Sequence, residues 1–229
     1  MHAPFTRYGL PQLVIYPLVV FILMVLLFVL FRPGRWLIPA ELVLFLVFLW
    51  MLSFFRDPSR VIVRDENVLY SPADGTITDI ELVEGTEPGS KALRIGMFLS
   101  IFNVHINRAP CSVRIEKLSY KKGQFKNAMS PDSSRVNESN DIYMVRLAEP
   151  KDKLLVRQIS GAIARHIVCE ARENSEYSQG ESFGMIKFGS RTELYLRAIE
   201  DGDSVKYEAC VKTGDPVRAG LTPLIRYLP

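Results

Sequence analysis

Two long apolar segments at the N-terminus constrain this 229-residue chain more than any other feature. Residues 13–31 contain no charged side chain, and residues 36–55 contain only Glu41. About 20 apolar residues are needed to cross the hydrocarbon core of a bilayer, so the first segment qualifies and the second is at the limit. The short loop between them carries two arginines, a proline and a glycine, which suit the headgroup region. We therefore expect residues 1–55 to form a transmembrane helical hairpin.

A cleaved signal peptide and a re-entrant anchor in one leaflet are the alternatives to this hairpin. A signal peptide has a shorter apolar stretch, and a second stretch does not follow it at once. The re-entrant anchor stays open, because the second segment is barely long enough to span. The arginines that flank the hairpin outnumber those in its loop by four to two, which favours both ends in the cytoplasm. We expect the cell (inner) membrane, with the rest of the chain on its cytoplasmic side.

Residues 56–229 are nearly neutral. Three of the 28 lysines and arginines and one of the 25 acidic residues lie before residue 56, which leaves 25 basic and 24 acidic residues. A net charge of +1 provides no general basic field, so nucleic acid is not expected as a partner. The cysteines, Cys111, Cys169 and Cys210, are odd in number, far apart and without a CxxC motif, which predicts reduced, buried thiols rather than a metal site or a disulfide.

The pattern of residues 56–229 predicts a mainly β (α+β) domain. Short alternating or β-branched segments follow one another between glycines and prolines, and no stretch shows a long helical stripe. We also find no evident internal repeat. The predicted strands are 76–82, 92–98, 112–118, 142–147, 154–159, 194–199 and 205–211.

Two turn segments indicate a particular kind of β structure. Residues 71–77 and 211–217 each join a glycine turn to a short strand, the rhythm of hammerhead-like barrels that carry lipoyl or biotinyl groups. Such carriers need a lysine at a hairpin tip in a Met-Lys context, and the nearest candidate, at residues 121–123, does not match. We therefore expect hammerhead or barrel-like β elements without a carrier function.

Few residues of this domain are suited to catalysis. His105 lies in a polar cluster between two apolar segments, and an imidazole exchanges protons near physiological pH. His166 lies in a strand-like run, which is typical of an ordinary surface or half-buried histidine. Asp74 stands in an Ala-Asp-Gly turn, where an aspartate often only caps the backbone. The chain has no HExxH, Walker or GxSxG motif, and the Gly-Ser pair at 189–190 is uninformative alone.

Five motifs in a fixed order are far more specific together. They are FFRDP at 54–58, SPADG at 71–75, HINRAP at 105–110, QISG at 158–161 with AR at 164–165, and FGS at 188–190. This set resembles the phosphatidylserine decarboxylase proenzymes, in particular their short bacterial and archaeal form, over residues 54–223. The resemblance implies pyruvoyl-dependent decarboxylation of phosphatidylserine to phosphatidylethanolamine and CO₂ in phospholipid biosynthesis, with the bilayer lipid as substrate.

The resemblance also implies self-cleavage between Gly189 and Ser190. The products would be a β chain, 1–189, and an α chain, 190–229, which stay together as partners. Ser190 would become an N-terminal pyruvoyl group that forms a Schiff base with the substrate, without a metal or pyridoxal phosphate. By the same resemblance, Asp74 and His105 are the candidates for activating Ser190, and His105 would return a proton to the product.

Three arginines are candidates for binding the phosphate or the carboxylate of the substrate, because a guanidinium suits both groups. Each has a plain structural or solvated role as its alternative. They are Arg108, Arg165 and Arg191.

Arg108 stands where the longer bacterial form has a second histidine. In that form two histidines three positions apart divide self-cleavage and decarboxylation between them. Here either His105 serves both steps, or cleavage relies on Asp74 and the local backbone.

Two other functions fit parts of the chain. One is a non-catalytic, membrane-tethered hammerhead carrier or adaptor, and the other is a serine hydrolase that uses Ser190. Both would leave the chain uncut. The sequence is also compatible with a homodimer.

Overall fold

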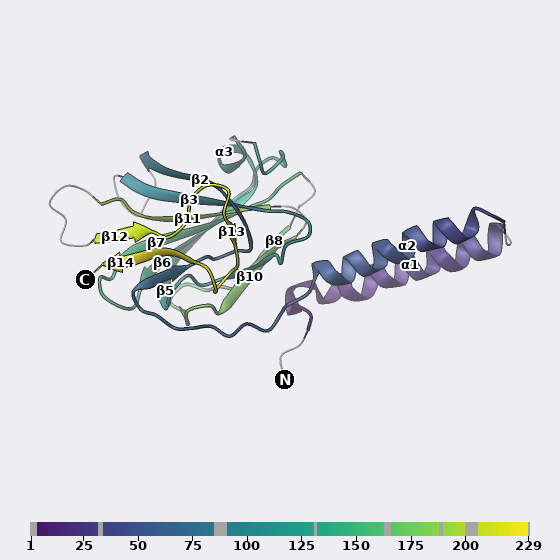
Figure 1. The fold of residues 1–229 in the computed structure, drawn as a ribbon, viewed down its shortest axis with the longest axis horizontal. Helices are drawn as coiled ribbons and strands as arrows, with labels where there is room; N and C mark the ends of the chain where they lie inside the picture. Colours follow the sequence, from purple (N-terminus) through teal and green to yellow (C-terminus); the bar gives the residue numbers. More distant parts are fainter. Residues whose placement is uncertain are drawn as a thin grey trace. The chain divides into compact units, whose positions relative to one another are not determined.

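The protein is described by a computed structural model, drawn in Figure 1. Its chain divides into two compact units, Met1–Ser59 and Arg60–Pro229. The described residues are 4–31, 34–84, 91–130, 132–162, 166–187, 190–199 and 206–228.

The N-terminal unit consists of two apolar helices. A 3₁₀ turn, η1 (Arg7–Gly9), leads into α1 (Leu10–Phe31), and α2 (Leu37–Phe54) packs against α1. Both helices are long and apolar enough to cross a membrane, and only 6% of the residues in each apolar stretch are buried. Helices that are apolar on every side are typical of membrane spans. The predicted pair of N-terminal apolar helices is confirmed, and it indicates membrane association.

The second unit is mainly β, as predicted, and each of the seven predicted segments overlaps a strand. Its largest sheet is strongly curled and has the strand order β13-β2-β3-β11-β7-β6-β5-β9, while two smaller sheets have the orders β1-β14-β12 and β4-β10-β8 (Figure 1). Ser133–Val136 forms a single helical turn, α3. The strands are β1 (Val68–Tyr70), β2 (Gly75–Glu84), β3 (Lys91–Leu99), β4 (Ile106–Arg108), β5 (Val113–Lys121), β6 (Ser139–Arg146), β7 (Lys153–Ile159), β8 (His166–Cys169), β9 (Glu176–Tyr177), β10 (Ser182–Lys187), β11 (Ser190–Arg197), β12 (Lys206–Ala209), β13 (Pro216–Val217) and β14 (Pro223–Leu228).

The strands form two similar halves. In the large sheet, β13-β2-β3-β11 is repeated in the opposite direction by β9-β5-β6-β7, and the two small sheets correspond to each other strand by strand. The halves meet at β11 and β7, where Leu194 pairs with Val156. Gly180 and Gly220 have positive φ values at equivalent turns before β10 and β14. The expectation of no internal repeat was therefore wrong for the structure, because the halves share their backbone pairing more than their residues.

The two turn segments that indicated a hammerhead-like fold pair with each other. Val217 in β13 pairs with Gly75 in β2, and the amide of Ile77 donates to the carbonyl of Asp215 at 2.9 Å. In the other half β9 pairs with β5 in the same way, with Tyr177 opposite Val113. Each half therefore has its own turn-and-strand unit, and the predicted hammerhead-like character is present twice.

The large sheet separates an apolar core from a charged face. Because side chains alternate along a strand, Leu194 and Leu196 of β11 enter the core while Arg191 and Glu193 point to the opposite face. The core also takes side chains from both small sheets, for example Phe183 of β10. The candidate site lies where the core-facing positions become polar.

Candidate active site

The two halves differ sharply at one end of the core. The backbone pairing becomes irregular directly after Ile77 in β2 and directly after Ile115 in β5. This shared irregularity aligns the two halves and defines which of their residues are equivalent. At four pairs of equivalent core-facing positions, one half has a leucine and the other half has a polar residue. The equivalent pairs are Leu69 and Asn107, Leu93 and Asn140, Leu154 and Thr192, and Leu196 and Gln158.

These four polar side chains form one buried chain of hydrogen bonds. Asn140 donates to Oε1 of Gln158 at 3.1 Å, and Nε2 of Gln158 donates to Oδ1 of Asn107 at 2.9 Å. Nδ2 of Asn107 then donates to Oγ1 of Thr192 at 3.0 Å. Buried amides are costly unless they are hydrogen-bonded, and leucine serves the equivalent positions of the other half. The chain links β6, β7, β4 and β11, so this end of the core is the candidate site.

Ser190 begins β11 at this end, two residues before Thr192. Its side chain is fully buried, and among the described residues its hydroxyl has no hydrogen-bond partner. Ser160 follows β7 directly, and because Arg191 pairs with Ile159, the register places Ser160 across from Ser190. The hydroxyl of Ser160 is buried and unpartnered in the same way. Such groups are rare in proteins, and two at adjoining strand ends indicate a functional site.

His105 immediately precedes β4 and is fully buried. Its Nδ1 lies 3.0 Å from the carbonyl oxygen of Asn103. A carbonyl only accepts hydrogen bonds, so Nδ1 carries the proton in this contact, and Nε2 is the basic nitrogen of the neutral ring. The amide of Ile186 donates to the carbonyl of His105 at 3.2 Å. Ile186 is four positions before Ser190 in the sequence, so His105 is held beside β10, the strand that precedes Ser190.

Asp74 lies in a buried turn at the same end of the large sheet. Its two carboxylate oxygens accept hydrogen bonds from Arg60 at 2.7 and 2.8 Å, and Oδ1 also accepts from the amide of Ala219 at 2.8 Å. The structure therefore pairs Asp74 with Arg60 and not with His105. The sequence showed Arg60 only as a flanking charge, and no local pattern signals a partner 14 residues away.

The three predicted arginines have different positions. Arg108 is buried and donates to the carbonyl of Gly180 at 3.1 Å. Arg191 points to the charged face of the sheet, away from the core side to which Thr192 and Leu194 belong. Arg165 lies outside the described residues, as does Gly189.

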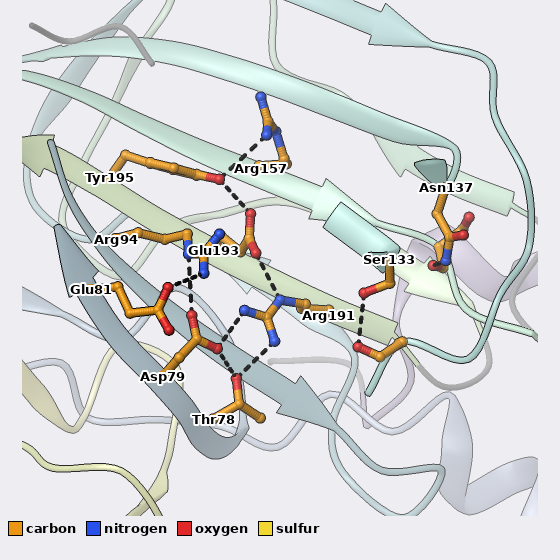
Figure 2. A network of polar contacts seen from close by, with 12 residues as sticks. Thr78, Asp79, Glu81, Arg94, Ser133, Asn137, Arg157, Arg191, Glu193 and Tyr195 are labelled. Atoms are coloured by element: carbon orange, nitrogen blue, oxygen red, sulfur yellow. Dashed lines mark hydrogen bonds and ion pairs between the residues drawn. The ribbon is translucent and has the colours of Figure 1, made fainter. Parts of the chain in front are cut away.

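Arg191 belongs to a network on the charged face (Figure 2). It donates to Glu193 at 2.7 Å, to Thr78 at 2.8 Å and to Asp79 at 2.5 Å. Burial alone would raise the pKa of Asp79, but hydrogen bonds from Thr78 and Arg191 and nearby positive charge bring it below its ordinary value. Gly96 leaves the space for this contact, because a Cβ there would overlap Nη2 of Arg191. The network stabilises the sheet that carries Ser190.

Replacing Arg191 by methionine is expected to destabilise the protein by about 3–5 kcal/mol, because it would leave the fully buried carboxylate of Glu193 without its cation. Urea denaturation of the detergent-solubilised protein measures this loss. The double variant R191M/E193Q should recover part of it. Wild-type stability combined with a weakened affinity for substrate would instead assign Arg191 to substrate binding.

A groove of about 480 Å³ also opens on the charged face. Arg94, Arg157 and Tyr195 line it, but Ser190, His105 and Asp74 do not. The groove is therefore separate from the candidate site, which is buried inside the domain.

One of the three cysteines adjoins the site, because the side chain of Asn140 hydrogen-bonds the thiol of Cys169. Cys111 is buried, which raises the pKa of its thiol to about 12, whereas Cys169 is half-buried and Cys210 exposed. All three thiols are free, but only Cys111 is fully buried as predicted. Within the described ranges, no three His, Cys, Asp or Glu side chains gather as a metal-binding group.

Comparisons with known proteins agree on one family. The family profile for phosphatidylserine decarboxylase matches residues 47–224. Three relatives, each named phosphatidylserine decarboxylase proenzyme, come from Rhodopirellula baltica, Pelagibacter ubique and Carboxydothermus hydrogenoformans. They are 39%, 38% and 36% identical over 98%, 78% and 86% of this chain and 88%, 80% and 96% of their own lengths. The order of motifs, the β domain with its polar end and these matches lead to one conclusion: the chain belongs to the phosphatidylserine decarboxylase family.

Proposed function

We propose that this protein converts phosphatidylserine into phosphatidylethanolamine and CO₂ with a pyruvoyl group that it makes from its own Ser190. The family supports the decarboxylase activity. The observation that carries the pyruvoyl proposal is the hydroxyl of Ser190 at the start of β11, which is fully buried and has no hydrogen-bond partner among the described residues. A hydroxyl that only stabilised a turn would be hydrogen-bonded. The lack of such a bond within the described ranges supports a reactive role for the hydroxyl of Ser190, in which it attacks the peptide bond that precedes it.

Self-cleavage would begin when Oγ of Ser190 attacks the carbonyl carbon of Gly189. The amide becomes an ester, and the hydroxyl proton must pass to a base. Nε2 of His105 is the candidate base, because Nδ1 is occupied by the carbonyl of Asn103. Elimination of the ester then releases a chain that ends in the carboxylate of Gly189. Residue 190 is left as dehydroalanine, whose hydrolysis releases ammonia and leaves the pyruvoyl group.

The same residues serve the decarboxylation. A pyruvoyl group supplies an electron sink for the electrons that CO₂ leaves behind. His105 would then return a proton from Nε2 to the carbon that lost CO₂. The hydrogen bond between Asn107 and Thr192 joins β4, which His105 immediately precedes, to β11, which begins at Ser190. At the same strand ends, the guanidinium of Arg60 would neutralise the negative charge of Asp74.

The substrate's phosphate and carboxylate need cationic partners. Arg108 and Arg165 are our candidates for these partners, whereas Arg191 is engaged by Asp79 and Glu193. Burial lowers the pKa of Lys187, which lies at the end of β10. Arg108 is buried, so the substrate headgroup would meet that positive charge within the domain rather than on its surface.

The apolar helices would hold the domain at the membrane that contains its substrate. Each buried CH₂ contributes about 0.8 kcal/mol, so a lipid with two acyl chains does not leave the bilayer readily. We propose that residues 1–55 anchor the protein in the cell (inner) membrane with residues 56–229 on the cytoplasmic side. After cleavage, the chains 1–189 and 190–229 would stay associated, because β11 pairs with both β3 and β7.

An intact mass spectrum of the denatured protein tests this proposal. We expect two chains, and the smaller one should be residues 190–229, lighter than that peptide by one ammonia and blocked to N-terminal sequencing. Release of CO₂ from carboxyl-labelled phosphatidylserine should accompany the cut form. A chain that stayed at 26.0 kDa during incubation would contradict the pyruvoyl mechanism.

A further inference from the structure

We propose that the catalytic domain touches the bilayer through its own surface, by a rim of exposed apolar and basic side chains beside Ser190, and that the rim fits an anionic lipid surface. The rim consists of the turn at residues 100–103 and the segment at residues 121–130. The inference rests on the proposed function in one respect, that the substrate is a bilayer lipid.

The first part of the rim is the turn that follows β3. Phe102 lies in this turn and is 69% exposed. Ser100 fixes the turn, because its amide and hydroxyl both donate to Oδ1 of Asn103 at 2.8 Å. The turn adjoins the site on both sides, since Leu99 before it pairs with Ser190 and the carbonyl of Asn103 contacts His105. An exposed aromatic side chain therefore stands in a turn that adjoins both Ser190 and His105.

The second part of the rim is the segment between β5 and α3. Residues 121–130 contain three lysines and no acidic residue. Phe125 is 39% exposed and Met129 62% exposed, and Lys122 and Lys126, on either side of Phe125 in the sequence, are also exposed. Apolar and basic side chains on one surface segment are typical of protein regions that lie in the bilayer interface.

Hydrogen bonds hold this segment beside the site. Nδ2 of Asn137 donates to the carbonyls of Lys126 and Ser160, each at 2.8 Å, and Oδ1 accepts from the amide of Lys126 at 2.9 Å. The hydroxyl of Ser133 donates to the carbonyl of Ala128 at 3.1 Å, and Ala128 is buried (Figure 2 shows Ser133 and Asn137). The segment is thus attached to Ser160, across from Ser190, and its apolar side chains are held outward.

A lipid bilayer is the occupant that this chemistry favours. The same chain carries two helices apolar enough to span a membrane, so the domain is kept near a bilayer. The lysines of the rim match the negative charge of a membrane that contains phosphatidylserine. Phe102 and Met129 would enter the interface on either side of the lipid whose headgroup reaches His105 and Ser190.

Activity on two forms of the substrate tests the rim in the full-length protein. The variants are F102S/M129S and K122E/K126E, assayed in vesicles of phosphatidylcholine and phosphatidylserine and, separately, on dissolved short-chain phosphatidylserine. We expect turnover in vesicles to fall about tenfold and turnover on the dissolved substrate to stay at the wild-type value. The control L147S/K151E changes an exposed leucine and lysine at the opposite end of β6 and should alter neither. Unchanged turnover of the rim variants in vesicles would overturn the proposal.

A second measurement does not depend on activity. In the variant F102W, with Trp36 and Trp50 replaced by phenylalanine, brominated phosphatidylcholine in the vesicles should quench the fluorescence of the introduced tryptophan. No quenching would overturn the rim, and if the rim variants also changed the oligomeric mass in detergent, the surface would be an interface between copies of this chain. Failure of the wild type to decarboxylate either substrate would instead contradict the proposed function, while the quenching would still test the rim.

Discussion

Replacing Ser190 by alanine is expected to leave a single chain of 26.0 kDa and to abolish decarboxylation. Alanine has no hydroxyl to attack the carbonyl of Gly189, so neither the ester nor the pyruvoyl group can form. The loss should therefore be complete, in contrast to the partial loss that follows removal of a hydrogen-bonding side chain. Denaturing mass spectrometry and CO₂ release from carboxyl-labelled phosphatidylserine measure the two effects in one preparation.

Ser160→Ala is the matched control for this prediction. Ser160 is also fully buried, its hydroxyl is also without a partner among the described residues, and the register places it across from Ser190. It does not follow the scissile carbonyl, however, so the S160A chain should still be cut into two. Cutting of the S190A chain at residue 189 would contradict the assignment of Ser190. An uncut S160A chain that folds normally would show that cleavage needs more than the serine at the cut.

Six of the seven strands that the sequence predicts have seven or more residues, which is long enough to show a period, and the seventh, β12, has four. β2, β3, β7 and β11 alternate over seven or more residues, because one side of each strand enters the core. β1, β4, β9 and β13 have only two or three residues, which is too short for alternation to be visible. The internal repeat escaped prediction for a related reason. Its halves share turns and pairing irregularities, which many sequences satisfy, while the residues at equivalent positions differ.

The site was only partly predictable. Ser190, His105 and Asp74 stand in motifs whose order resembles one family, so the sequence alone names them as candidates, and their roles stay predictions. The arginine that binds Asp74 could not be named in this way, because the contact of Arg60 depends on how the chain folds back over β2. The hydrogen-bonded chain from Asn140 to Thr192 was also missed, because its members lie on four different strands. Polar residues at core positions that are apolar in the other half are the signal that reveals it.

Replacing His105 by alanine is expected to lower decarboxylation per cleaved chain by about 10²–10⁴-fold, the usual contribution of a general acid or base. The effect is referred to cleaved chains, because slow cleavage alone would also lower the total activity. Arg108 stands in place of a second histidine, so either His105 serves both cleavage and decarboxylation or cleavage relies on Asp74 and the local backbone. The fraction of α chain in the same sample decides between these two alternatives. Normal cleavage by H105A would leave that step to the local backbone and Asp74, and an uncut chain would give both steps to His105.

The control and the rescue separate chemistry from structure. His166 is exposed on β8, so His166→Ala should retain both cleavage and turnover. The buried space left by His105→Ala should admit added imidazole and recover part of the turnover, whereas a mainly structural defect would not respond. Wild-type turnover per cleaved chain in H105A would remove His105 from the mechanism. The proton that the product carbon needs would then have to come from a group on another strand, and Lys187 at the end of β10 would be the next to test.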